Sequence, residues 1–182
     1  YTAPCNRNTP LCHHCSRPLG KKTKYPNLVL HIGHMKTGSS AMQSAFALST
    51  SLLKAKGIHY PDHRSREGAI AGRMTSGNFS RDDLTEVFDN ACREAPDAKT
   101  ILMSAEGAFQ IMVDGAGELR DLMARGVNVT VVLWLRNPVE VALSIYLQKV
   151  KNHGAKGSAG SFLSGETPHF FKVERALNSL WG

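Results

Sequence analysis

Two glycines, a lysine and a pair of serines stand close together in the segment HIGHMKTGSS. Gly33 and Gly38 allow the backbone to turn tightly, and the N–H groups of such a turn bind anions when a helix begins directly after it. Lys36 adds a positive charge, and Ser39 and Ser40 add hydroxyl donors. These residue types in this order predict a binding site for a phosphate or a similar oxyanion.

The position of the lysine distinguishes this glycine loop from an ordinary nucleoside-triphosphate loop. The two glycines have the G-x-x-x-x-G spacing of that loop, which continues with Lys and then Ser or Thr. Here Ser39 and Ser40 follow the second glycine, and Lys36 lies upstream of it. The displaced lysine predicts a nucleotide whose 5′-phosphate is held while a group other than a magnesium-bound γ-phosphate is transferred.

A second junction between a strand and a helix carries Arg136, in the segment LWLRNPVEVALSIY. Asn137 is predicted to cap the helix, with Pro138 as its first residue and Glu140 completing a capping box. Ser144 follows Arg136 by eight residues, about two helical turns, and an arginine fork with a serine hydroxyl forms a phosphate clamp. Ligands of parallel α/β sheets bind at the carboxyl ends of the strands. We therefore expect Arg136 and the glycine loop to share a crevice if their strands are neighbours.

An alternation of strands and helices is expected to position both motifs. Strands are predicted over residues 28–32, 100–106 and 127–135, with a short strand or extended turn at GIHYP; helices are predicted over residues 39–56, from residue 81 with Ser80 as N-cap, over residues 115–124, and from residue 138. This alternation implies right-handed crossovers and a mainly parallel sheet. The predicted fold class is three-layer α/β/α.

The composition indicates one globular domain preceded by a basic segment. The chain has 182 residues, of which 42% are hydrophobic and 20% charged. Residues 1–27 carry five of the basic residues and no acidic one, together with four prolines, and are predicted to form a linker or stalk before a domain over residues 28–182. The remainder is nearly neutral, so the net charge of +7 does not indicate nucleic-acid binding.

The basic segment also carries three of the four cysteines. Cys5, Cys12 and Cys15, with His13 or His14, have the donor types of a tetrahedral zinc site. Disulfides in a luminal stalk and free thiols are the alternatives, and the sequence leaves this open.

The compartment is also left open. No apolar run approaches the roughly 18 residues of a membrane span. Because the chain begins with Tyr rather than Met, we expect its natural N-terminus to be missing, and a signal peptide or membrane anchor would lie there. A Golgi-luminal and a cytoplasmic location both remain open.

The two motifs together resemble the nucleotide-binding signatures of sulfotransferases that use 3′-phosphoadenosine 5′-phosphosulfate (PAPS). The similarity is closest to the bacterial-type and carbohydrate-type branch, with its KTGTT and RNP…S.Y elements, and it covers about residues 28–182. It implies a P-loop NTPase-like fold, incomplete at its C-terminus, and a carbohydrate hydroxyl, or an amine, as acceptor. It also implies that the 5′-phosphosulfate is cradled by Lys36, Thr37, Gly38, Ser39 and Ser40, and that the 3′-phosphate is held by Arg136 and Ser144.

The chemistry that this resemblance implies accounts for the displaced lysine. Sulfuryl transfer moves SO₃ in line from a phosphate oxygen to the acceptor, and negative charge grows on the leaving phosphate. Lys36 would neutralise that charge as a catalytic residue, with help from the backbone N–H groups of the loop, so no metal is required. A general base must also deprotonate the acceptor, and we expect Glu106, just past the strand TILMS, to serve; His59 and His63 are alternatives. The acceptor is expected to face the polar, glycine-rich residues 61–80.

Two other functions compete with this one. A P-loop kinase or nucleotide hydrolase has the same glycine spacing, but it needs a lysine after the second glycine and an acidic strand end for magnesium. Ser39 and the strand ends MSAE and LWLR fit that requirement poorly. The other is a non-catalytic binding fragment, because the chain ends at VERALNSLWG, where the resemblance predicts a further strand and a segment that closes over the nucleotide.

Overall fold

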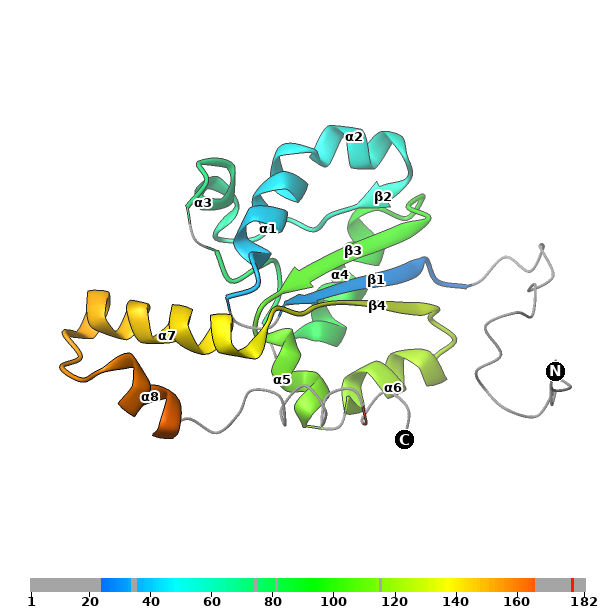
Figure 1. Cartoon of the computed structure of the whole chain (residues 1–182). Helices are drawn as coiled ribbons and strands as arrows, with labels where there is room; N and C mark the ends of the chain where they lie inside the picture. Colours follow the sequence, from blue (N-terminus) through cyan, green and yellow to red (C-terminus); the bar gives the residue numbers. More distant parts are fainter. Residues whose placement is uncertain are drawn as a thin grey trace, which may run out of the picture.

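Both predicted motifs follow the carboxyl ends of strands in a parallel sheet. A computed structural model describes residues 24–33, 36–73, 75–80, 82–114, 116–165 and 178. Within them, β1 (Asn27–Gly33), β2 (Ile58–His59), β3 (Thr100–Ala105) and β4 (Val129–Trp134) form one four-stranded sheet in the order β2-β3-β1-β4. All three pairings are parallel, which confirms the predicted α/β class with a parallel sheet. β1, which leads into the glycine loop, lies between β3 and β4 (Figure 1).

Helices follow or separate these strands. They are α1 (Ser39–Leu48), α2 (Thr50–Ala55), α3 (Arg66–Ile70), α4 (Leu84–Glu94), α5 (Ala108–Val113), α6 (Gly117–Ala124), α7 (Pro138–His153) and α8 (Ala159–Gly165). The core shows that they cover both faces of the sheet. Alternate β1 residues Leu28, Leu30 and Ile32 pack in one cluster with residues of α4, α5 and α6, whereas Val29 packs in a second cluster with residues of α1, α2 and α3. Burial on both faces explains why the residues of β1 are mostly apolar rather than alternately apolar and polar.

Two helix predictions need correction. The single helix predicted over residues 39–56 is wrong, because α1 ends at Leu48 and α2 begins at Thr50. The Thr50 hydroxyl donates to the Ala47 carbonyl at 2.8 Å, and such side-chain bonds compete with the helical pattern. The N-cap of α4 is Asp83 rather than Ser80, because the helix begins only at Leu84; the Asp83 carboxylate accepts from the Ser80 N–H at 2.6 Å. The short helices α3, α5 and α8 were not predicted.

The first described residues already belong to the folded part. The rings of Tyr25 and Phe88 lie 6.5 Å apart, and the Arg125 guanidinium lies 5.3 Å from the centre of the Tyr25 ring. The three cysteines of the basic segment lie outside the described residues. No helix among the described residues is long and apolar enough to cross a membrane.

Candidate functional site

The glycine loop leaves the sheet between the ends of β3 and β4. Ile32 pairs with Ala105 of β3, and Gly33 pairs with Trp134 of β4. The segments that carry Glu106 and Arg136 therefore begin on either side of the loop, and the condition that the strands of the two motifs are neighbours is met. Both motifs lie at the carboxyl edge of the sheet (Figure 1).

A hydrogen bond joins the two motifs directly. Nη1 of Arg136 donates to the backbone carbonyl oxygen of Lys36 at 3.2 Å. Nε of the same side chain donates to Oε2 of Glu140 at 2.8 Å, so Glu140 pairs with the arginine. This ion pair is about half exposed and contributes little to stability. Its consequence is geometric, because two partners fix the guanidinium beside the glycine loop.

The start of α7 forms as predicted at Asn137 and Pro138, but the predicted capping box is not formed, because the Glu140 carboxylate pairs with Arg136 instead of the Asn137 N–H. The Asn137 side chain accepts a hydrogen bond from the Val139 N–H at 2.9 Å, and Pro138 is the first helical residue. Ser144 lies in α7 and is half-buried, and within the described part of the chain its hydroxyl has no recorded hydrogen-bond partner. The structure therefore brings Arg136 to the loop, whereas no described contact joins Ser144 to Arg136.

The backbone of the glycine loop requires its two glycines for different reasons. A Cβ on Gly33 would lie 2.8 Å from Cβ of Ser39 and 3.1 Å from Oγ1 of Thr37, because the loop folds back over β1. Gly38 has a φ of +90°, in the left-handed region that favours glycine. Lys36 also has a positive φ, 65°, which is uncommon for a residue with a Cβ. His34 and Met35 lie outside the described residues.

The beginning of α1 has the features of an anion site. Gly38 is the N-cap and supplies no side chain, and the first turn holds no acidic residue. The first N–H groups of a helix lack partners within the helix and carry the positive end of its dipole. Ser39 is buried in this turn, and among the described residues the Lys36 ammonium has no recorded ion pair. N–H donors are therefore available at the start of α1, and Lys36 stands two residues before its N-cap.

Glu106 lies on the opposite side of the loop from Arg136. It follows β3 directly and is half-buried. Its N–H donates to the Ser76 carbonyl at 3.2 Å, and the preceding Ala105 forms an antiparallel bridge with Gly77. Glu106 therefore borders the segment that was predicted to face the acceptor.

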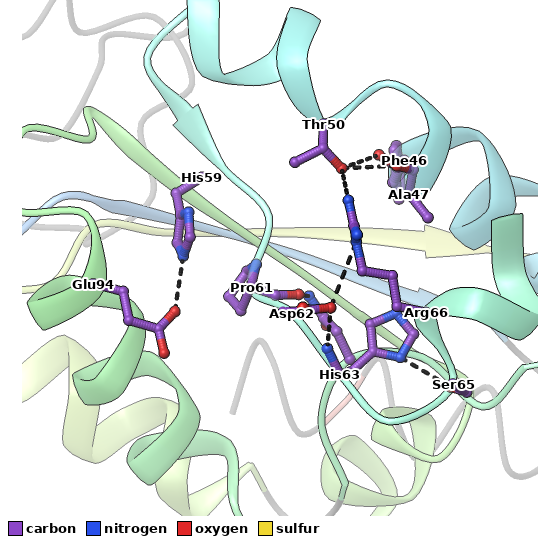
Figure 2. Close-up of polar contacts among 11 residues, drawn as sticks. Phe46, Ala47, Thr50, His59, Pro61, Asp62, His63, Ser65, Arg66 and Glu94 are labelled. Atoms are coloured by element: carbon purple, nitrogen blue, oxygen red, sulfur yellow. Dashed lines mark hydrogen bonds and ion pairs between the residues drawn. The ribbon is translucent and has the colours of Figure 1, made fainter.

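That segment is more ordered than its composition indicated. We call residues 61–73 and 75–80 the acceptor-side segment. Figure 2 shows its first half, where Arg66 lies between Asp62 and Thr50. Nδ1 of His63 and Oγ of Ser65 are 2.9 Å apart, and burial lowers the pKa of His63. His63 is therefore disposed to be neutral near pH 7.

His59 lies elsewhere. It pairs with Ile101 near the beginning of β3, whereas Glu106 follows the end of that strand. Its Nε2 lies 3.4 Å from a carboxylate oxygen of Glu94 (Figure 2). This position is toward the amino end of the sheet, away from the glycine loop, and favours Glu106 and His63 over His59 as candidate bases.

Sequence reasoning missed the residues that bind this segment to the sheet. The Asn78 side chain accepts from the Ser104 N–H at 2.8 Å and donates to the Leu102 carbonyl at 3.3 Å, so it takes the place of a neighbouring strand. The Ser104 hydroxyl in turn lies 2.8 Å from Nδ1 of the buried His31, whose pKa is lowered by burial. These pairs join residues far apart in sequence, so no local sequence pattern predicts them.

Comparison of the chain with protein-family models, with curated proteins and with solved structures found no match. Within the described residues, no group of three or more His, Cys, Asp or Glu side chains could hold a metal ion.

Proposed function

We propose that this chain is a PAPS-dependent sulfotransferase, which transfers a sulfuryl group to a hydroxyl, or an amine, of a carbohydrate acceptor. The observation that carries the proposal is the hydrogen bond from Arg136 to the Lys36 carbonyl, at 3.2 Å. It joins two motifs that are 100 residues apart in the sequence, and either motif alone would be a weak indication of function. The proposed fold is the three-layer, P-loop NTPase-like sulfotransferase fold, and the parallel sheet supports it.

Each motif would hold one end of the nucleotide. The 5′-phosphosulfate would lie against the loop of Lys36 to Ser40, where the first N–H groups of α1 are available. The 3′-phosphate would accept hydrogen bonds from Arg136, with Ser144 as a further donor. Two phosphate sites on different motifs would suit a 3′,5′-bisphosphorylated nucleotide, whose two phosphate groups are attached to different ribose carbons.

The transfer itself needs charge stabilisation and one proton acceptor. The bond between sulfur and the bridging oxygen breaks, the acceptor oxygen or nitrogen bonds to sulfur, and the 3′,5′-bisphosphate leaves. Lys36 would stabilise the charge that grows on the leaving phosphate. The proton of the acceptor would pass to the Glu106 carboxylate, which borders the acceptor-side segment through Ser76.

Thermal unfolding with different nucleotides tests the proposal. Adenosine 3′,5′-bisphosphate (PAP), the nucleotide product, should raise the Tm by roughly 5–10 °C at 100 times its Kd, because ligand binding to the native state then adds about 2.7 kcal/mol. Adenosine 5′-monophosphate, which lacks the 3′-phosphate, is the matched control and should have a smaller effect at the same concentration. A larger shift with ATP and magnesium would favour the kinase instead, and no shift with any nucleotide would contradict the proposal.

A further inference from the structure

We propose that Ser40 couples the nucleotide site to the acceptor-side segment, so that nucleotide binding loosens this segment before the acceptor binds. The inference rests on the proposed function, in which Ser40 contacts the 5′-phosphosulfate. Its basis is that the one hydroxyl proton of Ser40 already has a partner in the acceptor-side segment.

That partner is the backbone carbonyl of Thr75. Oγ of Ser40 donates to it at 3.3 Å, and Thr75 is only 5% exposed. The Thr75 hydroxyl lies 2.8 Å from Oγ of Ser65, which is the N-cap of α3. Ser65 then pairs with His63. A continuous chain of polar contacts therefore leads from the first turn of α1 to α3 and His63.

Three other attachments hold the segment independently of Ser40, and one of them is the bond from Nη2 of Arg66 to the Thr50 hydroxyl at 3.4 Å. On one side, Ser76, Gly77 and Asn78 are attached to the end of β3. On the other side, the Ser44 hydroxyl donates to the Ala69 carbonyl at 2.6 Å. Loss of the Ser40 contact would therefore loosen Thr75 and, through its contact with Ser65, the beginning of α3, while these attachments keep the rest of the fold in place.

The chemistry of a hydroxyl makes the two contacts of Ser40 mutually exclusive. A serine hydroxyl has one proton to donate, and both a peptide carbonyl and a phosphate oxygen can only accept. A bond to an anionic oxygen is roughly twice as strong as one between neutral groups, and the contact with Thr75 is long. The Ser40 hydroxyl should therefore donate its hydrogen bond to the nucleotide, and the Thr75 carbonyl then loses this donor.

Hydrogen exchange of the full chain, with and without PAP, tests this coupling. PAP at 100 times its Kd should slow exchange in residues 36–43 by up to about 100-fold. In the same sample, amides of α3 should exchange about fivefold faster, the effect of losing one neutral hydrogen bond. α6, on the other face of the sheet, is the internal reference and should not exchange faster.

Two serines of the same helix provide the matched variants. In Ser40→Ala, α3 should exchange about fivefold faster without nucleotide, and PAP at 100 times the Kd of this variant should protect the loop and not accelerate α3 further. Ser44→Ala also removes a bond from α1 to the segment, but PAP should still accelerate exchange of α3 in that variant. Ser40→Thr keeps the hydroxyl, so PAP should accelerate exchange of α3 in this variant as it does in the wild-type chain.

The outcomes separate this inference from the proposed function. If PAP protects the loop of the wild-type chain and leaves α3 unchanged or slower, the coupling is wrong and the proposed function stands. A further acceleration by PAP in Ser40→Ala would also overturn the coupling. If PAP protects neither region, the proposed function itself fails.

Discussion

Arg136→Ala is expected to weaken PAP binding by roughly 100-fold, because truncating one partner of a hydrogen-bonded charge pair typically costs about 2–5 kcal/mol. A guanidinium has five N–H donors. The described contacts of Arg136 use two of them, on Glu140 and on the Lys36 carbonyl, which leaves three for a ligand. Those two contacts also orient the fork before the nucleotide arrives, so little entropy is lost on binding. Isothermal titration of PAP into both proteins measures the effect.

The comparison ligand for this variant is adenosine 5′-phosphosulfate, which lacks the 3′-phosphate. The substitution should lower the affinity for this ligand far less than the affinity for PAP, because Arg136 is proposed to contact only the 3′-phosphate. Arg136→Lys keeps the charge but not the forked guanidinium, and its affinity for PAP should lie between those of the wild type and the alanine variant. Arg120→Ala, on α6, is the surface control and should bind PAP normally. Equal losses for both ligands would mean that Arg136 acts by holding the loop through the Lys36 carbonyl.

The parts of this site that could be predicted from the sequence depend on local rules. Four of the five residues at 28–32 are apolar because β1 is covered on both faces, so this strand can be predicted to within one residue at each end. Asn137 and Pro138 mark the start of α7 through the chemistry of helix termini. Gly33 and Gly38 follow from the backbone freedom that a tight loop demands.

The parts that could not be predicted depend on contacts between distant residues. The adjacency of β1 and β4 follows from the sheet order, and sequence reasoning could state it only as a condition. Asn78 takes the place of a strand beside β3, and Thr75 receives the Ser40 hydroxyl, yet both stand in a polar stretch that reads as an ordinary loop. The composition of residues 61–80 indicated a surface segment; it did not indicate which backbone groups would bind the sheet.

Gly77→Ala should be the most destabilising single change in the acceptor-side segment. Gly77 has a φ of +108°, and a Cβ there would lie 1.9 Å from the Ser104 carbonyl oxygen and 2.6 Å from Cα of Ala105. Both atoms belong to the backbone of β3, so no side-chain rotation can relieve the clash. The segment must move away from the strand, with loss of the bonds from Asn78 N–H to the Ser104 carbonyl and from Glu106 N–H to the Ser76 carbonyl.

The expected loss in the free energy of unfolding is about 3–5 kcal/mol, from roughly 1–2 kcal/mol of backbone strain and about 1 kcal/mol or more for each bond broken. For a chain of this size the Tm should fall by roughly 10 °C, which differential scanning calorimetry measures. Gly72→Ala is the matched control, because Gly72 also has a positive φ, +69°, but a Cβ there would meet no atom within 4 Å. It should show the strain alone, and the difference between the two variants isolates the close approach to β3. Equal losses would mean that the attachment of the segment at Gly77 does not depend on this approach.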